Sequence, residues 1–390
     1  MITANRINEA RTTEIIRDLV QIPSVNPSFE GGVPERAIAE YVERFLRRLG
    51  LATERREVQP DRPNVIAMLP GARNDLPGLL LEAHMDTVQT TNMTIEPLAA
   101  AIVDGRLYGR GACDTKASLA AMLAAVEWCV LNGVKPPVPV YLAATVDEEV
   151  HYTGILDLLQ LSGKFAAAIV GEPTELQAVI AHKGVVRCEI ETVGVAAHSS
   201  KPGEGVSAIE AMVQVITYFK EVIKPRLLAS PHPLVGPGSL SVTEIAGGVA
   251  PNTIPDRCRI KIDRRTIPGE NSEQVWADLR DELSALKLQD ERASVIVHDP
   301  FVLDYTLDTP ADSAIVRQLT SAASRRIGEV QILGVPYGTN ASKLALAGIP
   351  AVVFGPGSIH QAHTHDEWVD LQQVAQAAEI LLDTLLAYHS

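Results

Sequence analysis

Short apolar runs that end in acidic, histidine or glycine residues do most to limit what this chain can fold into. Runs of this length, without alternation of polar and apolar residues, are typical of strands buried on both faces. Because ligands in open α/β sheets bind beyond the carboxyl ends of the strands, residues distant in sequence can meet at one edge. The runs are residues 78–81 before His84 and Asp86, 138–144 before Glu148 and Glu149, 166–170 before Glu172, and 350–354 before Gly355.

Apolar residues at helical spacing predict helices over residues 7–20, 34–49 and 117–131. Together with the buried strands, they predict an α/β fold in which a mixed, largely parallel sheet is flanked by helices. Residues 185–298 differ, because alternating strands and an amphipathic helix over 207–223 occur there without a comparable acidic cluster.

We therefore predict that residues 185–298 form a second, α+β domain inserted into the first. The first domain then comprises residues 1–184 and 299–390. Two consecutive domains are the alternative, and they would leave the histidines near the C-terminus remote from the acidic residues.

The charge balance of the chain limits its partners. Its 48 acidic and 34 basic residues give a net charge of −14, and no block of lysine and arginine interrupts the acidic surplus. Nucleic acid is not expected as a partner, because phosphate binding needs a concentrated basic face. The N-terminus lacks the apolar core of a signal peptide, and no stretch reaches the ~20 apolar residues that span a bilayer. We expect a cytoplasmic protein without a membrane partner.

The first candidate site residues follow the predicted strands. His84 and Asp86 occupy alternate positions of an extended segment, so both side chains can point the same way, although such a pair alone is a weak signal. Asp114 follows a glycine-rich stretch, residues 109–111, which indicates a special backbone conformation. A plain helix N-cap is the alternative for Asp114.

The adjacent carboxylates of Glu148 and Glu149 repel each other unless a cation, a proton or solvent intervenes. A solvated loop is the usual setting for such a pair, but this pair directly follows a run apolar enough to be buried. Glu172 repeats the arrangement after another apolar run. The repetition favours a metal site.

Three of the ten histidines, His360, His363 and His365, lie in one short stretch near the C-terminus. A local histidine cluster favours metal binding, but we interpret His360 and His365 as loop residues or as residues that contact the ligands without binding metal. Nitrogen and carboxylate ligands suit zinc, with cobalt or manganese as substitutes. If two divalent ions each take one histidine and one carboxylate and share an aspartate, three carboxylates and one hydroxide balance the four positive charges.

These residues resemble, in order, the motifs of the dizinc family that contains acetylornithine deacetylase, succinyl-diaminopimelate desuccinylase, aminoacylase and glutamate carboxypeptidase. The resemblance runs nearly from end to end of the chain. The matching motifs lie at residues 62–64, 84–86, 109–116, 147–149, 171–174, 197–202, 247–255, 263–270 and 362–367.

The resemblance implies a role for each member of the cluster. Asp86 would orient His84, and a cis peptide bond would follow Asp114. The implied ligands are His84 and Glu172 for one zinc ion, Glu149 and His363 for the other, and Asp114 as the bridge between them.

The same resemblance makes the inserted segment a lid and dimerisation domain, so a homodimer is expected. His198 would stabilise the oxyanion of the reaction. The residues expected to hold a substrate carboxylate are Asn252, Arg265, Gly355 and Gly357.

Two positions depart from the family pattern. His365 stands where relatives commonly carry a small residue or proline, and Asn340 stands where many deacetylases carry aspartate. Both are expected to border the substrate pocket, so the substrate of any one relative does not transfer directly.

The function that follows is zinc-dependent hydrolysis of the acyl–nitrogen bond of a small N-acyl amino acid, as in acetylornithine deacetylase or succinyl-diaminopimelate desuccinylase. Metal-bound hydroxide would be the nucleophile, and Glu148 the general base and then acid. A carboxypeptidase or dipeptidase acting on a dipeptide at the same site is the alternative. The presence of Glu148 and all five ligands argues against a metal-dependent binding protein without activity, and no Gly-x-Ser-x-Gly motif supports a serine hydrolase.

Overall fold

The computed structural model describes residues 5–389, which divide into two compact units. Unit 1 takes the described part of Met1–Ile180, Thr309–Leu333 and Thr339–Ser390, and unit 2 takes Ala181–Asp308 with Gly334–Gly338. In sequence, unit 2 is therefore inserted into unit 1.

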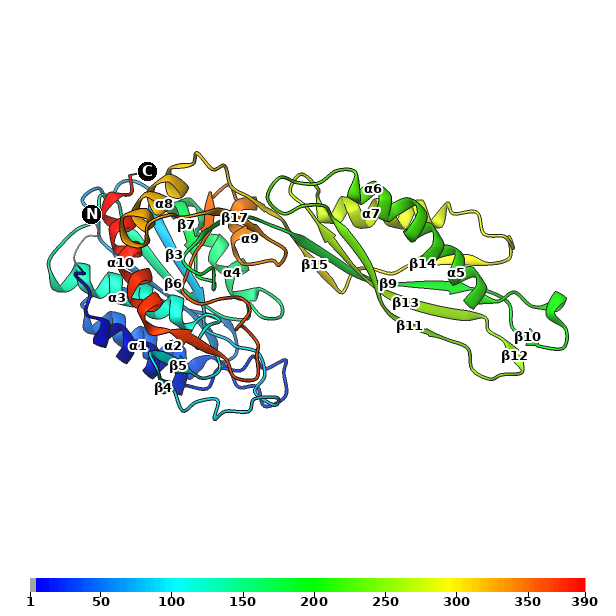
Figure 1. Ribbon diagram of the computed structural model, residues 1–390, viewed down its shortest axis with the longest axis horizontal. Coiled ribbons are helices and arrows are strands. Elements are labelled where there is room, and N and C mark those ends of the chain that lie inside the picture. The colour runs from blue at the N-terminus through cyan, green and yellow to red at the C-terminus, as the bar shows by residue number, and fades with distance from the viewer. Residues whose placement is uncertain (1–4, 390) are drawn as a thin grey trace. The chain divides into compact units, whose positions relative to one another are not determined.

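A nine-stranded mixed sheet contains most of the strands of unit 1 (Figure 1). Its middle strands β6, β3, β7 and β18 run parallel to one another, and antiparallel strands extend both edges. This confirms the predicted mixed, largely parallel sheet. The order is β1 (Ala52–Gln59), β2 (Arg62–Leu69), β6 (Val140–Thr145), β3 (Gly78–His84), β7 (Phe165–Val170), β18 (Ala351–Val353), β8 (Ala178–His182) and β16 (Leu307–Asp308), with β17 (Ile332–Val335) beside β8.

Helices flank this sheet, and every residue of β3 is buried between them. Helix α3 is apolar on nearly all sides, which is typical of a helix enclosed by protein, and it packs against α1, α10 and β3. Figure 1 shows α1, α3 and α10 on one side of the strands and α4 and α9 on the other. The helices are α1 (Glu9–Gln21), α2 (Arg36–Arg48), α3 (Lys116–Leu131), α4 (Thr153–Leu158), α8 (Ala314–Ile327), α9 (Ala341–Leu346) and α10 (Leu371–Ala387), with a 3-10 helix over Leu159–Lys164.

Unit 2 is an α+β unit built on a five-stranded antiparallel sheet. Its helices α5, α6 and α7 pack on the sheet around a separate hydrophobic core. The strands are β11 (Ser239–Gly247), β13 (Arg257–Thr266), β9 (Gly184–Val193), β14 (Ser294–Val297) and β15 (Val302–Asp304), and β10 (Ala197–His198) pairs with β12 (Thr253–Ile254). The helices are α5 (Ala208–Tyr218), α6 (Lys224–Leu228) and α7 (Ser272–Ser284), with a 3-10 helix over Pro202–Glu204.

One predicted helix differs from the structure. The amphipathic pattern over 207–223 is divided into α5 and a π-helical turn, Phe219–Ile223, which leads into α6. Apolar spacing does not distinguish a π turn from an α turn, because both keep Phe219 and Ile223 on the buried side. Among the helices of residues 5–389, none is long and apolar enough to cross a membrane.

Candidate metal centre

The parallel strands bring the acidic residues together, as the pattern of apolar runs predicts. His84 is the last residue of β3 and pairs in register with Thr145, the last residue of β6. Glu148 and Glu149 follow β6 by a few residues, and Glu172 follows β7, the other neighbour of β3. Three carboxylates and a histidine from three adjacent strands therefore lie at one edge of the sheet.

A small three-stranded sheet brings the remaining two residues to the same edge. Strand β5 (Arg106–Tyr108) pairs with β4 (Ala101–Val103) and with β19 (Trp368–Asp370). Because Trp368 lies opposite Tyr108, the segment before β19, which carries His363, meets the segment after β5, which carries Asp114.

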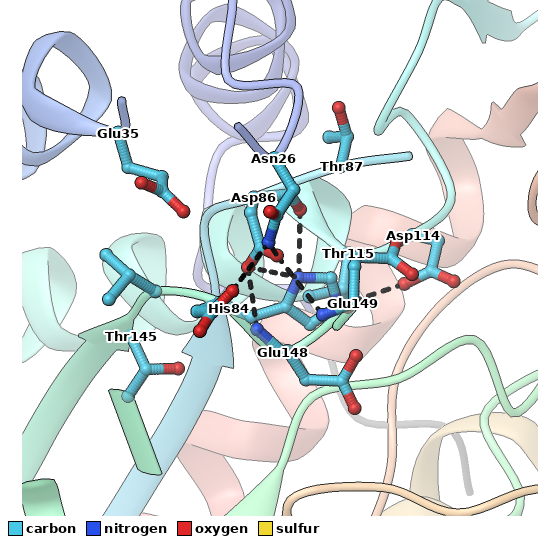
Figure 2. Close-up of polar contacts among 12 residues, drawn as sticks. Asn26, Glu35, His84, Asp86, Thr87, Asp114, Thr115, Thr145, Glu148 and Glu149 are labelled. Atoms are coloured by element: carbon cyan, nitrogen blue, oxygen red, sulfur yellow. Dashed lines mark hydrogen bonds and ion pairs between the residues drawn. The ribbon is translucent and has the colours of Figure 1, made fainter. Parts of the chain in front are cut away.

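The two oxygens of Asp114 face two different histidines. Its Oδ1 lies 3.1 Å from His84 Nε2, and its Oδ2 lies 3.3 Å from His363 Nε2. Glu172 Oε1 lies 3.9 Å from His84 Nε2, and Glu149 Oε1 lies 3.2 Å from His363 Nε2. Figure 2 shows Asp114 beside His84, with Glu148 and Glu149 close by. The five residues thus form two groups that share one aspartate.

These separations match the donor spacing around a metal ion. In a tetrahedral zinc site with bonds of ~2.1 Å, neighbouring donor atoms lie roughly 3.4 Å apart. One compact group of possible donors is His84, Asp114 and Glu149, and another is His84, Glu148 and Glu172. Glu148 is therefore near enough to His84 and Glu172 to be a third ligand there.

Electrostatics at this edge also favour cations. Burial raises the pKa of the Glu148 carboxyl to about 8, and the nearby Glu149 and Asp114 act in the same direction. Burial, with Asp114 and Glu148, likewise raises the pKa of Glu172. For His84, burial alone would lower the pKa, but its hydrogen bonds to Asp114 and Asp86 raise it well above the usual value. Crowded, buried carboxylates and histidines that favour positive charge fit a pair of divalent cations.

Asp86 connects the histidine to the acidic turn. Its Oδ1 lies 3.5 Å from His84 Nδ1, and its backbone oxygen lies 2.9 Å from the same nitrogen. The backbone N–H groups of Glu148 and Glu149 donate to the Asp86 carboxylate at 3.0 and 3.1 Å. Asp86 therefore lies where it can fix the His84 ring and the backbone of both glutamates.

Two positions at the site have a left-handed backbone. Asp147 has φ of 64° and His363 has φ of 62°, values that non-glycine residues adopt at a cost of about 1–3 kcal/mol. The Asp147 carboxylate accepts hydrogen bonds from Arg62 at 3.1 Å and from Thr153 at 2.7 Å. Surrounding contacts thus hold the turn that presents Glu148 and Glu149.

Asp114 is not a helix N-cap, so that alternative is wrong. Thr115 occupies the N-cap position of α3, and the Asp114–Thr115 peptide bond is cis. The loop before it is held by Glu367, a fully buried residue that accepts hydrogen bonds from the backbone N–H groups of Gly111, Cys113 and Asp114. Arg110 pairs with the same carboxylate at 2.6 Å.

Sequence reasoning missed two residues that support the site. Glu367 lies within the matching motif 362–367 without a role of its own there, and no pattern in the sequence marks Asn26. Asn26 is fully buried and donates from its side-chain amide to both Asp86 and Asp147. Their signal in the sequence is weak, because their partners lie many residues away.

The glycines expected to hold substrate have a clear packing role. A Cβ on Gly355 would lie 2.2 Å from Ser118 Oγ, and a Cβ on Gly357 would lie 2.6 Å from Cys113 Sγ. The Gly355 N–H donates to Thr174 Oγ1 at 3.1 Å, and the Gly357 N–H donates to Gln373 Oε1 at 2.9 Å. The close approach therefore requires glycine, while the substrate role stays a prediction.

The other predicted substrate residues belong to unit 2. His198 lies on β10, where its Nδ1 is 2.8 Å from Ser200 Oγ, and its backbone pairs with Thr253. Asn252 accepts a backbone hydrogen bond from Ser199, and Arg265 pairs with Asp263 at 2.8 Å. Their roles in binding or oxyanion stabilisation stay predictions.

The two departures from the family pattern lie in different settings. His365 is exposed, with its ring 3.8 Å from Asp366, and His360 is exposed on the same loop. Asn340 is buried instead, and its amide donates to Glu82 Oε1 at 3.0 Å. Glu82 also accepts from Thr145, so Asn340 serves a buried carboxylate of β3.

Comparison with known proteins identifies the class. The family described as peptidase family M20/M25/M40 matches residues 80–387. Acetylornithine deacetylase of Myxococcus xanthus is 32% identical over 361 residues, which cover 91% of this chain and 92% of the relative. The acetylornithine deacetylase of Buchnera aphidicola (strain Tuc7) is 28% identical and covers 92% of each chain. The chain belongs to the M20/M25/M40 peptidase family and is a hydrolase of that family.

Solved structures agree with this fold. The aminopeptidase PepT of Bacillus cereus superimposes with a TM-score of 0.79 at 20% identity, covering 97% of this chain and 98% of that one. A Bacillus subtilis protein described as a dinuclear metal-binding peptidase of the M20 family gives a TM-score of 0.73 at 18% identity, covering 97% of each chain.

Proposed function

We propose that the chain is a dizinc amidohydrolase that cleaves the acyl–nitrogen bond of a small N-acyl amino acid. The observation that carries this proposal is Asp114, whose two oxygens face His84 and His363 separately. In this proposal His84 and Glu172 hold one ion, and Glu149 and His363 hold the other. Zinc suits these nitrogen and carboxylate donors, and cobalt or manganese could substitute.

Two such metal ions, when bound, would polarise the scissile carbonyl and lower the pKa of a coordinated water towards ~7. The task left to the protein is proton transfer, and Glu148 is the group we assign to it. Its backbone is fixed by Asp86, and its buried carboxyl lies close to His84 and Glu172, where it can take a proton and then release it to the leaving amine. Asp86 keeps the His84 ring oriented throughout.

An acyl amino acid is the first choice of substrate because curated relatives that match about nine-tenths of the chain bear the name acetylornithine deacetylase. The second candidate is peptide cleavage, which is favoured by solved structures described as a metallo-carboxypeptidase of Sulfolobus solfataricus and human carnosine dipeptidase 1. Both reactions break an amide bond, so the same cluster can serve either one.

A substrate panel distinguishes the deacylase from the peptidase hypothesis. Zinc- and cobalt-loaded protein is assayed with N-acetylornithine, N-succinyl-diaminopimelate and simple dipeptides, and kcat/KM is compared. Faster turnover of an acyl amino acid supports the deacylase, and faster turnover of dipeptides supports the peptidase. Full activity after exhaustive chelation would refute the metal site itself.

We further propose that residues 185–298 act as a lid and as the contact surface of a homodimer. Strand β11 is an edge strand of the unit 2 sheet, and Ile245 on it is 62% exposed. Val249 just after this strand is 87% exposed, and Ile209 and Val213 on α5 are exposed as well. Unpaired strand edges and exposed apolar side chains commonly mark association surfaces.

The mass in solution tests the homodimer. We expect twice the chain mass for the parent protein and a monomer after Ile245→Lys, since a charge on the edge strand blocks strand pairing. A monomeric parent protein at assay concentration would contradict the dimer.

In the same proposal His198 stabilises the oxyanion, and Asn252 and Arg265 hold a substrate carboxylate together with the Gly355–Gly357 turn.

A further inference from the structure

Behind the carboxylate cluster lies a buried chain of polar contacts that starts in the N-terminal segment. Asn26 is fully buried, and its Nδ2 donates to Asp86 Oδ2 at 2.8 Å and to Asp147 Oδ1 at 2.9 Å. Both amide hydrogens are thereby used on two carboxylates (Figure 2 shows Asn26 beside Asp86). One neutral side chain thus bridges two negative ones.

The position of Asn26 is fixed by its own neighbours. Its backbone N–H donates to the Thr87 carbonyl at 2.9 Å, and its Oδ1 accepts the Ser28 backbone N–H at 3.1 Å. The Ser28 contact sets the orientation of the amide, because the oxygen faces a donor and the nitrogen faces two acceptors. Asn26 can therefore act as a rigid donor rather than a mobile one.

The two carboxylates that Asn26 bridges both help to hold the turn that carries Glu148 and Glu149. Asp86 accepts the backbone N–H groups of Glu148 and Glu149 and contacts His84. Asp147, the residue before Glu148, has a left-handed backbone and is also held by Arg62, which Glu35 pairs with at 2.6 Å. Without a donor between them, Asp86 and Asp147 would repel each other.

We propose that Asn26 is a positioning residue for the hydrolytic reaction: it holds Asp86 and Asp147 at a separation that sets the orientation of Glu148 and His84. This inference rests on the proposed metal-dependent hydrolysis. Asn26 acts through its neighbours, so its loss changes proton transfer and ligand geometry more than substrate binding.

The test compares Asn26→Asp and Asn26→Ala with the parent protein. Asn26→Asp keeps the size of the side chain but places a third carboxylate against Asp86 and Asp147. We expect kcat to fall by about 10–100-fold, the usual effect of removing a group that orients a metal ligand, while KM changes less than about threefold. The visible absorption spectrum of the cobalt-loaded protein should shift, because the ligand geometry changes.

Glu379→Gln is the matched control. Glu379 is buried on α10 and pairs with Arg326 at 2.8 Å, and its hydrogen-bond partners Arg6 and Ile7 also lie outside the site. This variant should lose thermal stability but keep the parent kcat and cobalt spectrum.

All values are taken on the folded fraction isolated by gel filtration. Parent-like kcat and spectrum in both Asn26 variants, with lowered melting temperatures only, would overturn the proposal. If the parent protein hydrolyses no substrate, the proposed function fails, yet the cobalt spectrum still decides the role of Asn26: a shift supports it and an unchanged spectrum refutes it.

Discussion

Unit 1 and unit 2 both place acidic residues on a sheet, but they balance the charge differently. On the open face of the unit 2 sheet, Glu191 pairs with Arg257 at 2.8 Å and with Arg259 at 3.1 Å. At the edge of the unit 1 sheet, Asp114 and Glu149 instead face histidines and other carboxylates.

The pKa values show what this difference means. Burial would raise the pKa of Glu191, but hydrogen bonds from Arg257 and Arg259 lower it. Burial raises the pKa of Glu148 and Glu172, and neighbouring carboxylates add to the effect. A carboxylate paired with arginines has its charge balanced within the protein, whereas buried carboxylates that face histidines and one another gain from added cations.

The largest effect on metal binding and turnover is expected from replacing the shared aspartate, Asp114. Asp114→Asn leaves one neutral oxygen acceptor where both groups need a charged bridge, so we expect metal binding to weaken and turnover to fall by roughly 10³–10⁴-fold, since metal catalysis supplies several kcal/mol. Metal content by elemental analysis and kcat are measured together. Glu191→Gln in unit 2 is the control and should keep both values. Retained metal and turnover in Asp114→Asn would refute the shared bridge.

Glu148→Gln should have the next largest effect. The amide keeps the shape of the side chain but cannot take a proton, so kcat should drop by about 10²–10⁴-fold while two metal ions stay bound. Loss of one ion per chain would instead make Glu148 a ligand, as its closeness to His84 and Glu172 allows.

A stability effect is expected at Glu82, a buried carboxylate of unit 1 that accepts from the neutral groups of Thr145 and Asn340. Asn340→Asp replaces the donor by a second acceptor and should lower the free energy of unfolding by about 1–3 kcal/mol, as measured by urea titration. The reciprocal pair, Glu82→Gln with Asn340→Asp, keeps one amide and one carboxylate and should recover part of the loss. If the free energy of unfolding is unchanged in Asn340→Asp, the contact between Asn340 and Glu82 does not stabilise the fold.

The smallest effect is expected on the exposed face of unit 2. Arg257→Gln leaves Arg259 to pair with the buried Glu191, and the Arg257 side chain is itself 56% exposed, so its own pairing contributes little. We expect a loss below about 1 kcal/mol in the free energy of unfolding. A loss several times larger would show that the charged face of unit 2 carries as much stability as a buried network.

Much of the fold and of the cluster could be predicted because both follow from local patterns. The apolar runs before His84, Glu149 and Glu172 predicted buried parallel strands, and parallel strands place the residues that follow them at one edge. Which atoms of Asp114 face which histidine depends on backbone geometry that no spacing encodes.

The supporting residues could not be predicted in the same way. Asn26 carries no ionisable group, and its partner Asp147 lies 121 positions along the chain. Glu367 lies 253 positions from Asp114, and the adjacent Asp366 gives an equally acidic signal. Hydrogen bonds between such distant groups become visible only once the sheets have fixed their register.

The hydrogen bonds from the Asp114 loop to Glu367 tie this loop to a segment that comes much later in the chain. The loop that carries the shared aspartate obtains its hydrogen-bond acceptor from the same late segment that supplies His363. During synthesis, a nascent chain that ends before this segment has neither the second histidine nor the acceptor that shapes the first half of the cluster. The arrangement seen around Asp114 can therefore form only after residues 363–367 have been made and have packed against the Asp114 loop.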